Sequence, residues 1–401
     1  MIWSLWPSNM FFPLIRYFPR ISTVVRLDRR CLSDITSSKS VTNGYLNVLH
    51  NNLDFLRLKG PTANEVAKDL DLSGKTCLIT GANSGIGLEM TRCMNARDCS
   101  VLMACRNPYA ANFVKNTCAK PDLLHFYETN LASLKSVKKT SDEILNRNQK
   151  IDIVILNAAV FGLPWTLTDD GLETSFQVNY LSQYYLLMNI EKVLSPNARV
   201  VFVSSESHRN ITWSMEEVLA PNVDLLSIPK EKYTSIKAYN VSKLCGLLAM
   251  HYLGYRWLNT GKQVFSAHPG SFVKTKLCRN WWVYEALYSF MLPFSKSISQ
   301  AASTPLYCAT SPELEGLSAL YFKDCQRCEE SELAKDFHLS CRINDLIYDL
   351  LREWISSSLG CNELMDEVSS DEGIQEAETD EYRDQRKDSM DKNTLISSYS
   401  G

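Results

Sequence analysis

The sequence predicts an α/β protein centred on a single doubly wound parallel sheet. Short apolar runs alternate with longer amphipathic stretches from Lys75 onward, a glycine-rich turn follows the first run, and 45% of the 401 residues are hydrophobic. Alternation of this kind is typical of a parallel sheet with helices on both faces, the Rossmann-type arrangement. The length suits one such domain of about 250–270 residues, flanked by tails.

About seven apolar runs have the length and character of buried strands. They lie at Lys75–Thr80, Ser100–Cys105, Leu124–Glu128, Asp152–Asn157, Arg199–Ser204, Gln263–Ala267 and Ser318–Phe322. Helical periodicity between and after them is clearest at Leu88–Met94, Ser133–Asn146, Glu173–Val193, Lys237–Leu258 and Asp345–Ile355.

Composition divides the chain into four parts. Residues 1–40 form a basic, aromatic extension, residues 41–73 a linker, residues 74–360 the α/β domain, and residues 361–401 an acidic tail that we expect to be disordered. The net charge of −3 argues against general affinity for nucleic acid.

The N-terminal extension bears on localisation. Its apolar run is too short and too often interrupted by proline to span a bilayer. Its basic, acid-poor composition fits a mitochondrial presequence or a membrane-surface anchor, and the alternative is an unstructured extension. The 13 scattered cysteines favour a reducing compartment, so we expect a cytoplasmic protein, with mitochondrial or membrane-associated localisation as alternatives.

One cysteine pair has motif-like spacing. Cys325 and Cys328 form a lone C-x-x-C, whereas a zinc site needs a second pair or nearby histidines. No such partner lies at suitable spacing, and we expect no metal.

The first strand ends in a glycine-rich turn that opens a helix. Glycines let the backbone turn sharply and approach a pyrophosphate closely, while the first N–H groups of the helix face the anion. The turn therefore predicts a dinucleotide site. Its expected contacts come from Gly81, Asn83, Ser84, Gly85, Ile86 and Gly87.

Tyr239 and Lys243 lie four residues apart in a predicted helix and so share a face. A free phenol has a pKa of about 10, too high for acid–base work at neutral pH. Neighbouring cations, here Lys243 and an oxidised nicotinamide ring, lower such a pKa by roughly 1–3 units each at close range. Tyr239 could then exchange a proton with an alcohol or carbonyl during hydride transfer. The structural alternative is a surface tyrosine and a solvated lysine.

The T-G-x-x-x-G-x-G turn, the Y-x-x-x-K pair and the strand ending in Ser204 and Ser205 resemble the short-chain dehydrogenase/reductase family. The resemblance implies that Ser205 is the catalytic serine, which hydrogen-bonds the substrate oxygen. It also implies that Asn179 holds a water on the proton relay to Lys243. The structural alternatives are a strand cap for Ser204 and, for Asn179, an amide that satisfies backbone groups within a helix.

Further positions match the family's cofactor contacts. Asn157, Ala158 and Ala159 resemble its N-A-G turn beside the ribose, and Pro269 and Gly270 resemble the turn that caps the nicotinamide pocket.

Two pairs of positions are less regular. Asn130 and Leu131 stand where the family has Asp-Leu, so Asn130 would accept from the adenine amino group without a charge. Ser271 and Thr275 follow the capping turn and could reach the carboxamide or the pyrophosphate.

The cofactor is expected to be NADP(H) rather than NAD(H). An NAD enzyme carries a carboxylate about 20 residues past the glycines, which accepts from the ribose 2′-hydroxyl. This chain has Arg106 and Asn107 there, and a guanidinium suits a 2′-phosphate.

Four segments narrow the resemblance to the retinol-dehydrogenase-like branch of the family. Within that branch they look most like members that carry two N-terminal WW modules. The segments are residues 161–179, 203–209, 280–284 and 312–317. A WW module needs two tryptophans about one strand span apart. Trp3 and Trp6 are crowded together, and the next tryptophan is Trp165. We therefore expect no WW module in this sequence and no scaffold role based on proline-rich ligands.

Two segments stand outside the core pattern, Asn210–Lys237 and Trp281–Phe294. The second is rich in large apolar side chains at the place of the family's substrate lid. It indicates a lipophilic alcohol or ketone, such as a retinoid or a steroid. The alternatives are an ordinary core helix and a segment that dips into a membrane surface.

The sequence thus favours an NADP(H)-dependent oxidoreductase that interconverts a lipophilic alcohol and its carbonyl. Peripheral membrane contact and a homodimer are both compatible with it. The alternative is a signalling adaptor that retains the fold and the cofactor pocket but acts through protein partners. The complete set of Ser205, Tyr239, Lys243 and Asn179 favours the enzyme.

Overall fold

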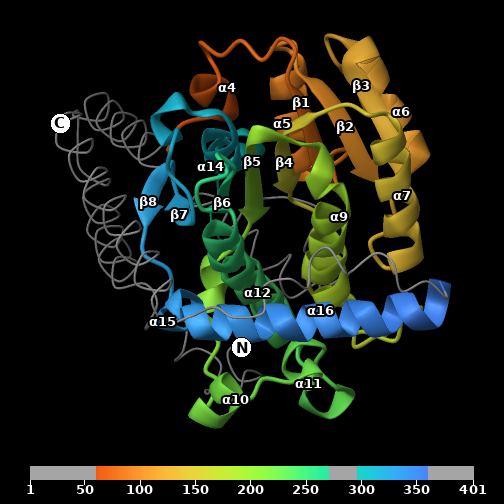
Figure 1. Cartoon of the computed structure of the whole chain (residues 1–401). Helices are drawn as coiled ribbons and strands as arrows, with labels where there is room; N and C mark the ends of the chain where they lie inside the picture. The colour runs from red at the N-terminus through yellow and green to blue at the C-terminus, as the bar shows by residue number, and fades with distance from the viewer. Residues whose placement is uncertain (1–59, 271–295, 360–401) are drawn as a thin grey trace, which may run out of the picture. The chain divides into compact units, whose positions relative to one another are not determined.

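The computed structural model describes residues 60–270 and 296–359. Within them one eight-stranded sheet has the order β3-β2-β1-β4-β5-β6-β7-β8 (Figure 1). Neighbouring strands are parallel except for β7 and β8. The strands are β1 Thr76–Thr80, β2 Ser100–Cys105, β3 Leu124–Glu128, β4 Ile151–Leu156, β5 Leu194–Val203, β6 Gln263–His268, β7 Leu320–Lys323 and β8 Gln326–Cys328.

The first seven strands lie at the predicted apolar runs, and the doubly wound α/β fold is confirmed. β8 is an addition. It joins β7 through a two-residue turn, Asp324 and Cys325, with left-handed φ angles of 56° and 58°. Such turns usually carry Asn-Gly or Asp-Gly, so the hairpin has no clear signal in the sequence.

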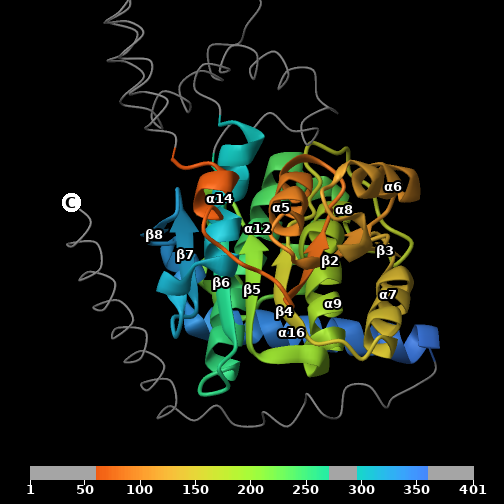
Figure 2. The ribbon, with the colours of Figure 1, turned by 90° about the horizontal axis from the view of Figure 1, so that it is seen from above.

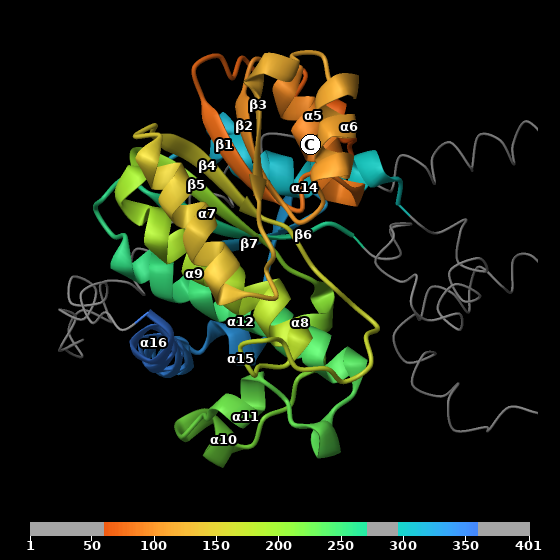
Figure 3. The ribbon, with the colours of Figure 1, turned by 90° about the vertical axis from the view of Figure 1, so that its right-hand side faces the viewer.

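Helices cover both faces of the sheet (Figure 2, Figure 3). Along β1, Cys77 and Ile79 pack into one core, whereas Leu78 between them packs into the other. This alternation is the period of a strand that is buried on both faces. The first core includes α5 (Gly85–Asn95), α6 (Pro108–Thr117) and α14 (Ile298–Thr310), and the second α7 (Leu134–Asn146), α9 (Ser182–Ile190) and α12 (Ser235–Arg256).

The helical run predicted at Glu173–Val193 is present but irregular. It begins as α8 (Thr174–Phe176), passes through a π-helical turn (Gln177–Leu181) and continues as α9. A π turn inserts one residue into the helix and is frequent at functional sites.

The last described helix, α16 (Phe337–Leu359), begins before the predicted segment Asp345–Ile355 and ends after it. It follows the short α15 (Glu332–Lys335) and crosses α9 and α12 (Figure 1). Its first half buries polar groups that find partners there: Oγ of Ser340 donates to the carbonyl oxygen of Leu248 at 2.5 Å. Buried polar residues interrupt an apolar pattern, which is why the prediction was too short.

Smaller elements complete the described chain. α4 (Ala63–Val66) precedes β1, and α10 (Met215–Leu219) and α11 (Val223–Leu226) form an insert away from the sheet (Figure 3). No helix in the described ranges is both long and apolar enough to cross a membrane. The predictions for residues 1–40, Ser271, Thr275, Trp281–Phe294 and the acidic tail lie outside the described residues.

Candidate active site

The predicted site residues meet at the carboxyl edge of the sheet. The glycine turn follows β1, Asn157 follows β4, Ser205 follows β5 and Pro269 follows β6. These four strands are parallel neighbours, so their carboxyl ends lie at one edge. α12, which carries Tyr239 and Lys243, packs against β5 and β6. The strand order reverses between β1 and β4, where open sheets bind their ligands.

The glycines in the turn after β1 are required by conformation and by space. Gly81 and Gly85 have left-handed φ angles of 66° and 53°. A Cβ on Gly87 would lie 2.3 Å from the carbonyl oxygen of Gly81 and 2.7 Å from Nδ2 of Asn157. α5 begins here, and its N-cap residue Ser84 makes no side-chain capping hydrogen bond. The first N–H groups of α5 are therefore placed to bind an anion.

The turn after β4 is fastened to the end of β1. Oγ1 of Thr80 accepts hydrogen bonds from the backbone N–H groups of Asn157 at 2.8 Å and Ala158 at 3.0 Å. The side chain of Asn157 donates to the carbonyl oxygen of Thr80 at 2.9 Å. Asn157 and Ala158 thus hold the two strands together beside the glycine turn, and Ala159 follows, half-buried.

Tyr239 and Lys243 lie close together on α12. Nζ of Lys243 is 5.5 Å from the centroid of the Tyr239 ring and donates to the carbonyl oxygen of Val203 at 2.8 Å. Burial lowers the pKa of Lys243 to about 8. Phe161 packs edge-on against Tyr239, with ring centroids 4.9 Å apart. Lys243 is therefore a buried cation beneath a half-buried tyrosine, which differs from a solvated surface pair.

The two serines after β5 have different surroundings. Ser204 is buried, and its Oγ donates to the carbonyl oxygen of Lys243 at 3.2 Å, which ties the strand end to α12. Ser205 is half-buried and begins a short 3-10 turn, where its Oγ accepts from the N–H of Ser207 at 3.2 Å. That contact leaves the hydroxyl proton of Ser205 for a substrate oxygen.

Asn179 lies in the π-helical turn and connects two parts of the site. Its Oδ1 accepts from the N–H of Val160 at 2.7 Å, and its Nδ2 donates to the carbonyl oxygen of Val160 and to Oγ of Ser242, both at 3.0 Å. Ser242 in turn donates to the carbonyl oxygen of Tyr239 at 2.7 Å. The amide thus satisfies backbone groups, and its role in holding a water stays a prediction.

The residues after β2 lie next to the glycine turn. Arg106 is exposed and forms no ion pair with a described carboxylate. Asn107 caps α6, because its Oδ1 accepts from the N–H of Ala110 at 3.0 Å. Asn83 of the glycine turn donates from Nδ2 to the carbonyl oxygen of Asn107 at 3.3 Å. Asn107 is thus held beside the glycine turn, and Arg106 precedes it in the chain as an exposed residue.

Asn130 and Leu131 follow β3. Asn130 is half-buried. Its Oδ1 accepts from the N–H of Ala132 at 3.2 Å, so the side-chain amide stabilises the turn in which it lies. The carbonyl oxygen of Leu131 accepts from Oγ of Ser182 at 2.7 Å. Adenine recognition by this pair stays a prediction.

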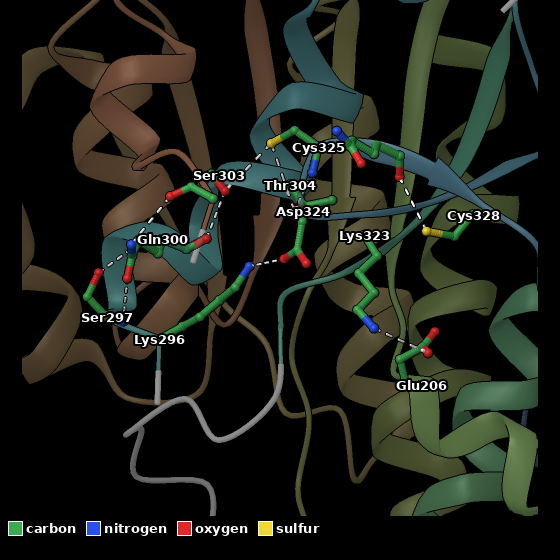
Figure 4. Close-up of polar contacts among 12 residues, drawn as sticks. Glu206, Lys296, Ser297, Gln300, Ser303, Thr304, Lys323, Asp324, Cys325 and Cys328 are labelled. Carbon is green, nitrogen blue, oxygen red and sulfur yellow. Dashed lines mark hydrogen bonds and ion pairs between the residues drawn. The ribbon is translucent and has the colours of Figure 1, made fainter. Parts of the chain in front are cut away.

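The turn after β6 packs on a lysine that no sequence motif singles out. Gly270 has a φ of 105°, and a Cβ there would lie 2.4 Å from Cδ of Lys296. Lys296 forms an ion pair with Asp324 in the β7–β8 turn (Figure 4). His268, just before Pro269, is buried with no hydrogen-bond partner for either ring nitrogen among the described residues, and burial lowers its pKa to about 4.

The C-x-x-C cysteines do not form a joint site. Sγ of Cys325 lies 3.7 Å from Oγ of Ser303 on α14, whereas Sγ of Cys328 lies 3.7 Å from the carbonyl oxygen of Gln326. In Figure 4 the two sulfur atoms contact different groups rather than each other. Within residues 60–270 and 296–359, His, Cys, Asp and Glu side chains form no cluster that could hold a metal ion.

The fold and this edge of the sheet define an oxidoreductase of the doubly wound α/β class. Comparison with known proteins makes the class specific. The family model described as short chain dehydrogenase matches residues 75–215. The chain belongs to this family, since relatives more than 30% identical match it over more than two thirds of its length. The resemblance read from the glycine turn and the Tyr-Lys pair is confirmed.

The WW domain-containing oxidoreductase of Drosophila melanogaster is 43% identical over 299 residues, which cover 73% of this chain and 72% of the relative. Retinol dehydrogenase 12 of Mus musculus is 34% identical over 290 residues, or 71% of this chain and 88% of the relative. An uncharacterised protein from Mycobacterium Paratuberculosis is similar in structure, with a TM-score of 0.58 and 25% identity over 73% of this chain and 97% of that chain. The chain is thus related to both groups that the sequence indicates.

Proposed function

We propose that the protein is an NADP(H)-dependent oxidoreductase that interconverts a lipophilic alcohol and its carbonyl. The observation that carries the proposal is the place of Lys243, a buried ammonium 5.5 Å from the Tyr239 ring centroid. No carboxylate of the described residues forms an ion pair with it. Burying an unpaired cation is costly, and groups with such perturbed pKa values cluster at functional sites.

The residues at the sheet edge fit a pyridine dinucleotide. Gly87 leaves the space that a Cβ would fill, and the uncapped start of α5 would hold the pyrophosphate. Pro269 and Gly270 would border the nicotinamide end. When bound, the cofactor supplies or accepts the hydride.

The protein's own groups would manage the proton and the substrate oxygen. In the reducing direction, Ser205 donates a hydrogen bond to the carbonyl oxygen, and Tyr239 gives its phenolic proton to the same oxygen as the carbonyl carbon gains hydride. The product is an alcohol, and Tyr239 is left as a phenolate. Lys243, whose pKa of about 8 keeps it mostly protonated at neutral pH, stabilises that phenolate. Oxidation reverses each transfer.

The preference for NADP(H) follows from the residues after β2. The exposed guanidinium of Arg106 has no described ion-pair partner, so it can bind a 2′-phosphate. The side chain of Asn107 is engaged in capping α6 and carries no charge. A carboxylate that would favour the 2′-hydroxyl of NAD(H) is absent from this pair of positions.

Two observations support the proposed substrate class: the apolar ring of Phe161 beside Tyr239, and the similarity to proteins named retinol dehydrogenase 12. The ring of Phe161 lies edge-on to Tyr239 and makes this side of the site apolar. Relatives named retinol dehydrogenase 12 are similar over 71% of the chain. Both support a lipophilic substrate of the retinoid or steroid kind.

The test is NADPH oxidation with a panel of lipophilic aldehydes and ketones, followed by loss of absorbance. We expect turnover by the wild type and a loss of about 100-fold or more in Tyr239→Phe, because general acid catalysis contributes factors of that order. The variant should still bind NADPH. Equal rates in the two proteins would exclude this mechanism, and NADPH binding without turnover across the panel would favour the adaptor.

A further inference from the structure

A buried histidine contacts the turn that carries Ser205. His208 is inaccessible to solvent, and its Nδ1 lies 2.6 Å from the carbonyl oxygen of Ser205. Its other nitrogen, Nε2, accepts from the backbone N–H of Ser331 at 3.1 Å. A backbone N–H can only donate, so Nε2 is the unprotonated nitrogen and Nδ1 carries the proton. The neutral ring therefore bridges Ser205 and Ser331.

A second set of contacts holds the His208 ring from the sheet side. Tyr321 of β7 packs edge-on against it, with ring centroids 5.4 Å apart. The hydroxyl of Tyr321 donates to Oε1 of Glu206 at 2.6 Å, and Nζ of Lys323 lies 3.6 Å from Oε2 of Glu206 (Figure 4). The residue after Ser205 is thus anchored on β7, while the ring of His208 stands between β7 and Ser331.

The segment 329–331 that His208 reaches also contacts the helix of Tyr239. Oε1 of Glu330 lies 2.8 Å from Nε2 of His251 on α12, and both side chains are buried. Nη2 of Arg209 donates to the carbonyl oxygen of Glu329. The segment after β8 therefore touches both elements of the site, the Ser205 turn through His208 and Arg209, and α12 through His251.

We propose that His208 is a positioning residue, which holds the Ser205 turn against segment 329–331 and so fixes Ser205 relative to Tyr239. The inference rests on the proposed function. The physical reason is that both groups must meet one substrate oxygen, and a displacement of about 1 Å in such an arrangement can cost about 100-fold in rate. Neither contact of His208 involves substrate or cofactor, so it acts through Ser205.

His208→Phe and His208→Asn form the first test. Phenylalanine keeps a ring in the space but removes both nitrogens. The amide nitrogen of asparagine can take the place of Nδ1 and donate to the carbonyl oxygen of Ser205. We expect kcat with a lipophilic carbonyl to fall about 10- to 100-fold in His208→Phe and to recover in part in His208→Asn. The dissociation constant for NADPH, measured by fluorescence, should stay within about twofold of the wild type.

Ser331→Pro and Ser331→Ala form the second test. Ser331 caps α15 through its hydroxyl and has a φ of −68°, which proline adopts readily. Both variants lose the cap, but only proline loses the N–H that reaches His208. We expect kcat to fall about tenfold more in Ser331→Pro than in Ser331→Ala. Melting temperatures identify any variant that fails to fold.

The outcomes separate the two proposals. Absence of turnover in the wild type on the whole panel overturns the proposed function, and this inference with it. Turnover by the wild type with the same kcat in folded His208→Phe overturns the positioning role alone. Equal kcat in Ser331→Pro and Ser331→Ala likewise overturns it, because a role in core packing only would change the melting temperature and leave kcat per folded molecule unaltered.

Discussion

At the residue scale, Lys243 combines a functional position with a cost in stability. Its side chain is buried, its single described hydrogen bond goes to the carbonyl oxygen of Val203, and burial lowers its pKa from 10.5 to about 8. A pKa lowered by burial means that the charged form is less stable in the folded protein than in the unfolded chain. The role proposed for Lys243 beside Tyr239 gives a functional reason for this cost.

We expect Lys243→Met to be more stable than the wild type and inactive. The pKa of Lys243 is about 8 in the folded protein and 10.5 for an unperturbed lysine, as in the unfolded chain. Between pH 8 and 10.5 the unfolded chain therefore binds more protons than the folded protein. The free energy of unfolding of the wild type should rise with pH across this range. Below pH 8 the lysine costs up to about 3 kcal/mol, which methionine avoids.

Thermal unfolding without cofactor at pH 7 and pH 10 measures this effect. Lys243→Met should have a higher melting temperature than the wild type at pH 7. The difference between the two melting temperatures should be smaller at pH 10. A lower melting temperature for Lys243→Met at pH 7 would mean that the hydrogen bond to Val203 outweighs the desolvation of the ammonium.

Arg106 gives a second prediction at the residue scale. Arg106→Asp should weaken NADPH binding by about 10- to 100-fold, while NADH binding changes little, because a hydrogen-bonded charge pair is worth about 1.5–3 kcal/mol. Arg352→Asp is the matched control, since Arg352 is an exposed arginine on α16. Fluorescence titration with both nucleotides gives the ratio. An unchanged ratio in Arg106→Asp removes Arg106 from the 2′-phosphate site.

At the scale of elements, the glycine turn and α12 offer a matched pair of substitutions. A Cβ on Gly87 would lie 2.3 Å from a backbone oxygen, whereas on Gly246 in α12 the nearest atom is Cδ1 of Phe202 at 3.6 Å, an ordinary contact. Gly87→Ala should therefore lose about 1–3 kcal/mol through overpacking and lose NADPH affinity. Gly246→Ala should gain about 0.5–1 kcal/mol from helix propensity. Urea unfolding compares them, and equal stabilities would contradict the close approach at the turn.

The elements also show what can be predicted from sequence. Strand β2 (Ser100–Cys105) has the predicted bounds, because a strand buried on both faces is a continuous apolar run between polar turns. The first half of α16 was missed, since Ser340 makes its hydrogen bond with a residue of α12 that is distant in sequence. β8 was missed because its turn uses Asp324 and Cys325.

Within the site, too, features that depend on neighbouring residues can be predicted, and features that depend on distant residues cannot. Tyr239 and Lys243 are recognisable because their spacing on one helix is local, and the glycine turn because its conformation is local. The contacts that His208 and Lys296 make have no local signal in the sequence, although His208 lies within the family-like segment 203–209. Their partners, Ser331 and Asp324, lie far along the chain, and only the folded sheet brings them to this edge.

At the scale of the whole domain, the two hydrophobic cores support different parts of the site. The core that includes α5 and α14 supports the glycine turn and the turn after β6. The core that includes α9, α12 and α16 supports Asn179, Tyr239 and Lys243. The site lies at the carboxyl ends of the strands, between these two layers. A dinucleotide bound by the glycine turn on one side would therefore lie next to the proton-transfer groups on the other.

The central claim is that Tyr239 transfers a proton while hydride moves at this edge, and deuterium transfer tests it most directly. NADPH deuterated at C4, in each of its two stereochemical forms, would be incubated with a lipophilic aldehyde, and the alcohol analysed by mass spectrometry. We predict one deuterium on the carbinol carbon from one form only with the wild type, and almost none with a Tyr239→Phe variant that still binds NADPH. Labelled alcohol in equal yield from both proteins would contradict the account.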